Sequence, residues 1–237
     1  MSQEASEDPA LENRLASVRR GIAEAAAAAG RDPEELTLIV VTKFHPASLV
    51  RELAALGVTD VGENRHQEAQ AKAAELEDLD LRWHFIGQLQ TKKARQAARY
   101  AQAIHSIDRE RLVETLATAE LPDPARPIDA FVQVNLTDDP GRGGAAPAEF
   151  ERLAERVMEA PTLRLRGVMA VAPLPEEEAA ASAFARLHGY AERVRAIDPD
   201  ATGISAGMTH DYVEAIAAGA THLRIGSAIT GNRPLAG

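Results

Sequence analysis

The sequence contains no cysteine among its 237 residues. Disulfide bonds, thiolate metal sites and a cysteine nucleophile are therefore excluded. No apolar run is long enough to form a transmembrane helix, which needs about 20 residues. The acidic, polar N-terminus is unlike a signal peptide. Together these absences predict a cytoplasmic protein with no membrane partner.

Acidic residues outnumber basic ones, 36 to 26. The formal net charge is -10 at pH 7, which argues against nucleic acid as a partner because phosphate binding normally needs a basic face. The 7 histidines show no HExxH or other tight ligand spacing, so no metal site is predicted. The remaining composition, with 45% hydrophobic and 26% charged residues, is ordinary for a soluble globular chain with a well-formed core.

Short apolar segments alternate with segments of helical periodicity along the chain. A first helix is expected over residues 9–30, where apolar residues recur at steps of three and four. The expected strands cover residues 36–42, 58–62, 81–86, 103–107, 128–136, 163–171, 202–205 and 222–225. The helices expected between them cover residues 46–56, 67–79, 91–100, 108–119, 147–159, 176–197 and 209–218.

This alternation predicts an α/β protein with a parallel sheet. Eight strand–helix units match a single closed (β/α)8 TIM barrel with an extra N-terminal helix. An open doubly wound sheet is the rival, but no GxGxxG motif follows the first strand, which disfavours its dinucleotide-binding form. We expect a flexible tail over residues 1–8 and one barrel domain over residues 9–237.

Lysine is rare, since only four of the 26 basic residues are lysines. Lys72, Lys92 and Lys93 fall on expected helices with many charged neighbours, which predicts solvated helix faces. Lys43 instead follows an apolar strand at its carboxyl end, which is the active-site end of a (β/α)8 barrel. A lysine there can form a Schiff base, which arginine cannot do, although a solvated loop lysine explains the position equally well.

Two glycine-containing turns follow the last two expected strands. They include Gly207 after the seventh strand and Gly226 with Ser227 after the eighth. Barrels often bind phosphate between these two loops. Because the first and eighth strands are neighbours in a closed barrel, one ligand carrying an aldehyde and a phosphate would satisfy both Lys43 and the turns. Pyridoxal 5′-phosphate (PLP) is such a ligand.

Several segments resemble the pyridoxal phosphate homeostasis protein family, and the match runs from residue 11 to residue 233. The stretch WHFIGQLQ over residues 83–90 is its most specific part. The other segments are VVTK (40–43), GEN (62–64) with QE (67–68), GVMA (167–170), SAGM (205–208) and RIGSAI (224–229) with Gly231. The resemblance implies a barrel of the alanine racemase type, PLP fold type III, with PLP as the cofactor.

The resemblance also implies roles for individual residues. Lys43 matches the Schiff-base lysine of the family, Asn64 an asparagine near the cofactor, and Arg224 the arginine that faces the pyridine nitrogen. The residues that fall on the phosphate-binding turns are Ser205, Gly207, Met208, Gly226 and Ser227.

The resulting hypothesis is a monomeric PLP-binding protein with little or no turnover. The resemblance implies a role in the homeostasis of PLP (vitamin B6) and in amino-acid balance, with PLP-dependent apo-enzymes as acceptors. A weak PLP-dependent amino-acid racemase is the alternative, and a PLP-free class I aldolase is a third reading.

The resemblance to alanine racemase implies that racemisation needs a tyrosine from an additional domain. Of the three tyrosines in the chain, Tyr212 lies nearest to the phosphate turns. His84, inside the specific stretch, either lines the barrel mouth or packs in the core.

Overall fold

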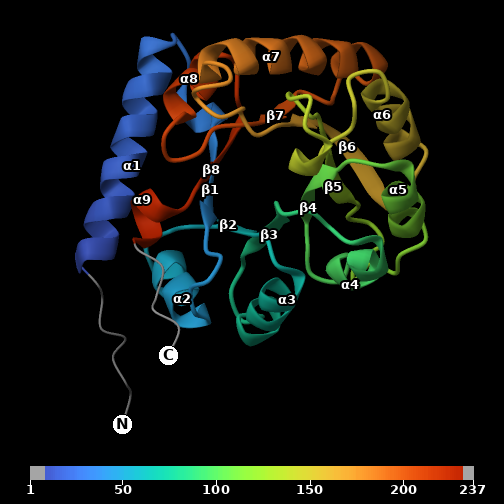
Figure 1. The fold of residues 1–237 in the computed structure, drawn as a ribbon. Helices are drawn as coiled ribbons and strands as arrows, with labels where there is room; N and C mark the ends of the chain where they lie inside the picture. The colour runs from blue at the N-terminus through green and yellow to red at the C-terminus, as the bar shows by residue number, and fades with distance from the viewer. Residues whose placement is uncertain (1–8, 232–237) are drawn as a thin grey trace.

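A closed barrel of eight parallel strands, paired in sequence order, forms the centre of the molecule in this computed structural model, which describes residues 9–231 (Figure 1). This confirms the expected (β/α)8 barrel, while the tail expected over residues 1–8 lies outside the described residues. The strands are β1 (Thr37–Val41), β2 (Asp60–Glu63), β3 (Arg82–Phe85), β4 (Ala103–Ile107), β5 (Ile128–Gln133), β6 (Leu163–Met169), β7 (Gly203–Ser205) and β8 (His222–Ile225).

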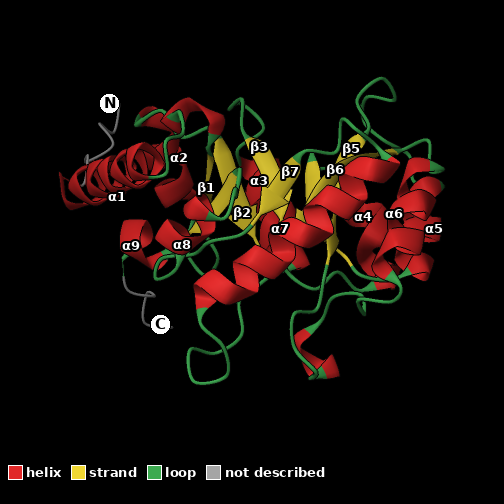
Figure 2. Cartoon of the chain, turned by 90° about the horizontal axis from the view of Figure 1, so that it is seen from above, coloured by secondary structure: helices red, strands yellow, loops and turns green. Residues whose placement is uncertain are grey.

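Helices surround the strands, as the view in Figure 2 shows. The α-helices are α1 (Pro9–Ala28), α2 (Ala47–Ala55), α3 (His66–Glu75), α4 (Ala94–Ala97), α5 (Glu110–Ala117), α6 (Phe150–Met158), α7 (Ala180–Ile197), α8 (Tyr212–Ala217) and α9 (Ser227–Thr230). The described residues also form the short 3-10 helices η1 (Pro33–Glu35), η2 (Thr91–Lys93) and η3 (Pro140–Arg142). The expected N-terminal helix, α1, packs on α8 and α9 and so covers the closing strands of the barrel (Figure 1).

The strands are almost entirely buried because both of their faces are covered. Side chains on the outer face, such as Val40, Trp83 and Val132, belong to the hydrophobic core shared with the helices. Several aromatic and imidazole side chains lie inside the barrel. His105 stacks on Phe131 with centroids 4.3 Å apart, and Phe131 meets His222 edge-on at 5.0 Å. The interior is therefore a packed layer of side chains and not a pore.

Several helices begin a few residues after the expected position, and for two of them local contacts give the reason. Helix α7 begins at Ala180 and not at residue 176, because the preceding glutamates form local contacts of their own. Glu177 accepts the N–H of Leu174 at 3.0 Å, and Glu178 accepts the hydroxyl of Ser182 at 2.7 Å. Helix α5 begins at Glu110 without a side-chain cap, since the nearby Asp108 carboxylate is bound by the guanidinium of Arg109.

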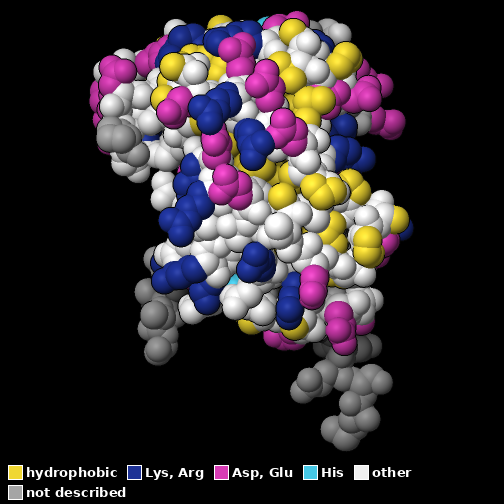
Figure 3. All heavy atoms as spheres, turned by 90° about the vertical axis from the view of Figure 1, so that its right-hand side faces the viewer, with side chains coloured by type: hydrophobic (Ala, Val, Ile, Leu, Met, Phe, Trp, Pro, Cys, Tyr) yellow, Lys and Arg dark blue, Asp and Glu magenta, His cyan; other side chains and the backbone are white. Residues whose placement is uncertain are grey.

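Acidic and basic side chains are interspersed over the face that Figure 3 shows, the side on which α5 and α6 lie. Ion pairs join the helices there. Arg152 of α6 contacts Glu110 of α5 at 2.8 Å, and Arg193 of α7 contacts Glu151 of α6 at 2.8 Å. These pairs are exposed, so each contributes little to stability. None of the helices within residues 9–231 is long and apolar enough to cross a bilayer.

Candidate functional site

The carboxyl ends of β1 and β8 lie side by side. Their register places Val40 beside Ile225, and beyond this pair both chains run on in the same direction. A Cβ atom on Gly226 would lie 3.3 Å from Cβ of Val41, so the absence of a side chain lets the two segments approach closely. Lys43 follows two residues after Val41. The structure therefore brings the lysine and the Gly226–Ser227 turn to the same mouth.

The backbone around Lys43 has an unusual conformation. Phe44 has a φ of 68°, a left-handed value that costs an ordinary residue about 1–2 kcal/mol. Its N–H donates to Oε2 of Glu68 at 3.1 Å, and its ring lies 4.6 Å from the guanidinium carbon of Arg65. Contacts from the start of α3 thus hold the residue after Lys43 in place and leave the lysine side chain exposed.

A buried ion pair lies directly behind this segment. Nζ of Lys72, on α3, is 2.6 Å from Oε1 of Glu63 and 2.8 Å from the carbonyl oxygen of Thr42. The Thr42 hydroxyl also donates to Oε1 of Glu63 at 2.7 Å. The expectation of a solvated Lys72 is therefore wrong, because its side chain is only 9% exposed. Burial raises the pKa of the Glu63 carboxyl, and the hydrogen bond from Lys72 offsets this only in part.

Asn64 follows β2 and faces the same end of the barrel. Its Oδ1 atom is buried and has no hydrogen-bond partner among the described residues. An unpaired buried acceptor is costly, so this oxygen is suited to receive a hydrogen bond from a bound group. The loop after β3 holds the Asn64 backbone closely, since a Cβ on Gly87 would lie 2.3 Å from its carbonyl oxygen.

The substitution Gly87→Ala is expected to displace Asn64 from the mouth. The added methyl group overlaps the Asn64 backbone, and overpacking of this kind costs about 1–3 kcal/mol. Thermal unfolding should show a lower melting temperature. As the matched control, Gly189→Ala adds a methyl where nothing lies within 4 Å, so an equal loss in both variants would contradict the expectation.

Arg224 is the positive group buried beneath the mouth. Its Nη1 donates to Oγ of Ser205 at 2.6 Å and its Nη2 to the carbonyl oxygen of Ala170 at 2.8 Å. Burial lowers the pKa of Arg224 to about 10, so the guanidinium remains charged at neutral pH. The N–H of Arg224 donates to the carbonyl oxygen of Gly207 at 2.9 Å, which ties β8 to the turn after β7.

The residues expected at the phosphate turns divide into two groups. Gly207, Gly226 and Ser227 lie in the turns that follow β7 and β8. Ser205, in contrast, is the last residue of β7, and its hydroxyl points into the barrel, where it contacts Arg224 and lies 2.7 Å from Nδ1 of His105. Met208 is exposed, and its N–H donates to Oδ1 of Asp211 at 2.5 Å.

The tyrosines and His84 have packing contacts. A Cβ on Gly21 of α1 would lie 2.5 Å from the Tyr212 hydroxyl, so this side chain faces α1. Tyr190 packs edge-on against Phe150, and the Tyr100 hydroxyl lies 3.3 Å from Nδ1 of His66. His84 is buried inside the barrel between Asp60 and His105, so of its two readings the structure supports packing in the core.

Sequence reasoning missed Glu63 and His105. Glu63 ends an apolar strand at the active-site end of the barrel, and this position is the same signal that singled out Lys43. His105 lies in the middle of the strand AIHSI, where a polar ring in a short, otherwise largely apolar strand could have been noticed.

Comparison with known proteins agrees with this geometry. Residues 14–234 match the family described as alanine racemase, N-terminal domain. The fold is also that of an alanine racemase from Corynebacterium glutamicum, with a TM-score of 0.66 at 16% identity over 95% of this chain and 62% of the racemase. The fold and the mouth thus define a barrel of the alanine racemase type.

Nearer relatives narrow this class. The pyridoxal phosphate homeostasis protein of Pseudomonas aeruginosa is 43% identical over 225 residues, which cover 94% of this chain and 96% of the relative. PipY of Synechococcus elongatus, with PLP bound, has a TM-score of 0.77 at 35% identity and covers 93% of this chain and 100% of its own. The chain belongs to the pyridoxal phosphate homeostasis protein family.

Proposed function

We propose that this chain binds PLP and holds it as a Schiff base on Lys43, and that it serves in PLP homeostasis with little or no catalytic turnover. The observation that carries the proposal is the adjacency of Lys43 and the Gly226–Ser227 turn. The names of the relatives and the PLP bound to PipY support the same reading.

The groups at the mouth fit the parts of PLP. The Lys43 amine condenses with an aldehyde and releases water. The turn at Gly226 and Ser227 offers backbone N–H groups and a hydroxyl to a phosphate. Asn64 offers its unpaired buried oxygen to a donor, and the buried Arg224 guanidinium offers a donor to the ring nitrogen. These four groups lie on or directly after strands β1, β2 and β8, which are contiguous in the closed barrel.

The arginine also bears on turnover. PLP, when bound, supplies an electron sink for carbanions. A guanidinium beside the ring nitrogen disfavours protonation of that nitrogen because like charges repel, and this weakens the sink. The contacts of Tyr100, Tyr190 and Tyr212 with packing partners give none of them the position of a second acid or base at Lys43. We therefore infer that the chain holds PLP with little or no turnover of a substrate.

Borohydride reduction of the purified protein in the presence of PLP tests the proposal. The reduced pyridoxyl group is expected on Lys43 in a tryptic peptide map, and Lys43→Ala should lose both this adduct and the visible absorbance of bound PLP. Lys93→Ala, which alters another lysine outside the mouth, serves as the control. A colourless protein that does not bind added PLP would overturn the proposal. If the reduced pyridoxyl group is found only on other lysines, Lys43 is excluded as the Schiff-base residue.

The acceptors and the lack of turnover are tested separately. The loaded protein should restore activity to an apo form of a PLP-dependent enzyme, as expected for a monomeric cytoplasmic carrier. Incubation with amino acids in deuterated water should leave their α-protons unexchanged. Exchange that depends on Lys43 would instead favour the racemase reading.

A further inference from the structure

A path of hydrogen bonds crosses the inside of the barrel from end to end. From Arg224, Nη1 lies 2.6 Å from Oγ of Ser205, and that oxygen lies 2.7 Å from Nδ1 of His105. Nε2 of His105 lies 2.9 Å from Nδ1 of His84, and Nε2 of His84 lies 2.8 Å from Oδ1 of Asp60. The path therefore joins five strands, β8, β7, β4, β3 and β2.

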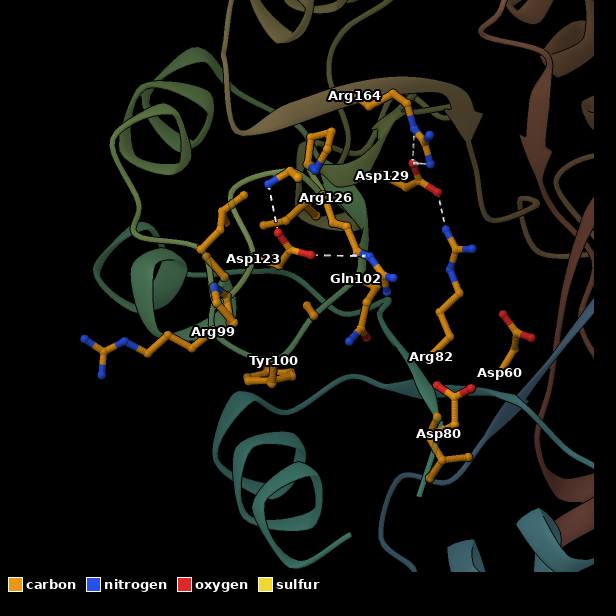
Figure 4. A pocket seen from close by; sticks show the side chains of 18 of the residues that line it. Asp60, Asp80, Arg82, Arg99, Tyr100, Gln102, Asp123, Arg126, Asp129 and Arg164 are labelled. Atoms are coloured by element: carbon orange, nitrogen blue, oxygen red, sulfur yellow. Dashed lines mark hydrogen bonds and ion pairs between the residues drawn. The ribbon is translucent and has the colours of Figure 1, made fainter. Parts of the chain in front are cut away.

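The two ends of this path lie in different surroundings. The four residues from Arg224 to His84 are buried, whereas the Asp60 side chain is 18% exposed. Asp60 lines a cavity of about 690 Å³ at the amino ends of the strands, opposite the mouth. Figure 4 shows Asp60 near Arg82, and in the same view Asp129 lies between Arg82 and Arg164. A carboxylate with access to solvent is thus connected to a buried guanidinium at the other end.

The chemistry of the two ends decides the direction of every bond between them. A guanidinium can only donate, and an ionised carboxylate can only accept. Burial tends to raise the pKa of Asp60, but the hydrogen bonds from His84 and Thr59 outweigh it and leave the pKa lowered. Burial lowers the pKa of His84 and that of His105, so each ring is neutral, with one N–H and one acceptor.

Only one arrangement of protons satisfies these conditions. His84 donates from Nε2 to Asp60, so its Nδ1 must accept from His105. His105 then carries its proton on Nε2 and accepts at Nδ1 from the Ser205 hydroxyl. The Ser205 oxygen accepts in turn from Arg224. Every donor points from Arg224 towards Asp60, and bonds aligned in this way polarise and strengthen one another.

Arg224 needs such support because its partners are neutral oxygens. Its guanidinium donates hydrogen bonds to Oγ of Ser205 and to the carbonyl oxygen of Ala170. A long side chain stays in one orientation only when its contacts are themselves fixed, and Ser205 is fixed by His105. We propose that Asp60, His84 and His105 are positioning residues that act through Ser205 to orient the Arg224 guanidinium beneath the cofactor mouth. The orientation of Arg224 by these residues does not depend on the proposed function. Only the identity of the group that Arg224 faces, the ring of bound PLP, rests on it.

The first part of the test uses the free protein. Nitrogen-15 NMR at neutral pH should show both His84 and His105 as neutral rings protonated at Nε2, and should resolve the guanidinium signals of Arg224. The variant His105→Phe keeps an aromatic ring against Phe131 but removes both hydrogen bonds, so the Arg224 signals should average. A ring protonated at Nδ1, a cationic ring, or unchanged Arg224 signals in the variant would overturn the proposal.

The second part measures PLP binding from the far end of the path. Asp60→Asn keeps the shape of the side chain but removes its charge, and it should raise the Kd for PLP about threefold, because charge-assisted hydrogen bonds are roughly twice as strong as neutral ones. His105→Phe leaves the Ser205 hydroxyl without its fixed partner, and it should raise the Kd about tenfold if the bond between Ser205 and the charged Arg224 guanidinium is lost as a result. Both variants should also change the visible spectrum of the bound cofactor, which a purely structural role would leave unchanged.

Asp80→Asn is the matched control, since Asp80 is an exposed carboxylate on the same cavity (Figure 4) and lies outside the path. The proposal requires that Asp60→Asn shift the affinity and the spectrum while Asp80→Asn leaves both unchanged. Equal behaviour of the two variants would overturn it. If the wild-type protein fails to bind PLP, the proposed function fails, and the NMR measurements on the free protein still decide the role of the path.

Discussion

Replacing Lys72 with methionine is expected to destabilise the protein by about 3–5 kcal/mol, because the substitution leaves a buried charge without its partner. Glu63 is 1% exposed and receives bonds from Lys72 and from the Thr42 hydroxyl. Its second oxygen, Oε2, is already buried without a partner among the described residues. Without Lys72 the carboxylate must remain charged in an apolar setting or take up a proton, and both cost free energy.

Urea unfolding at neutral pH measures this loss. Lys93→Met is the matched control, because Lys93 lies outside the core on η2 and surface substitutions usually change stability by less than about 0.5 kcal/mol. The double variant Glu63→Leu/Lys72→Met should recover most of the stability, since an apolar pair often replaces a buried ion pair at little cost. If Lys72→Met unfolds at the same urea concentration as Lys93→Met, the pair does not carry the stability assigned to it.

Lys72 also shows where sequence reasoning reached its limit. The segment HQEAQAKAAE predicts a helix, and α3 spans it as His66–Glu75. The charged residues on both sides of Lys72 predict a solvated side chain. In the structure Lys72 lies on the side of the helix that faces β2, and Glu63 lies at the end of that strand. The pairing depends on the rotation of the helix relative to the barrel. That rotation is set by packing between segments and not by local composition.

The barrel itself was predictable for a physical reason. Strands covered on both faces read as short apolar runs, and helices read as longer periodic ones, so the order of elements along the chain already favoured the closed sheet over an open one. The adjacency of Lys43 and Gly226 followed from closure alone, because the first and last strands then pair. The inward direction of Ser205 did not follow, since the strand it ends is only three residues long and offers too little alternation to tell its two faces apart.

Stability is expected to fall steeply when the pH drops below about 6.5, the ordinary pKa of histidine. Burial lowers the pKa values of His84 and His105, and it lowers that of His222 to about 3. When the pH is above the ordinary histidine pKa, these rings are neutral in both the folded and the unfolded chain. Their contribution to the free energy of unfolding is then fully present. Below it the unfolded chain binds protons that the folded chain rejects, so the equilibrium moves towards unfolding. Each ring then costs about 1 kcal/mol per pH unit.

The three rings together should therefore lower the free energy of unfolding by up to about 4 kcal/mol per pH unit, the slope reached while only the unfolded chain protonates all of them. Glu63 works in the opposite direction, since burial raises its pKa and favours the folded state as the pH falls, but one carboxyl does not offset three histidines. Urea midpoints measured from pH 7.5 down to pH 5 test the slope. His222→Phe, which keeps a ring against Phe131, should reduce the slope by about a third, whereas His210→Ala at an exposed position should not. A midpoint that stays level over this range would mean that the rings inside the barrel accept protons while folded, and the neutral path from Arg224 to Asp60 would then be lost as well.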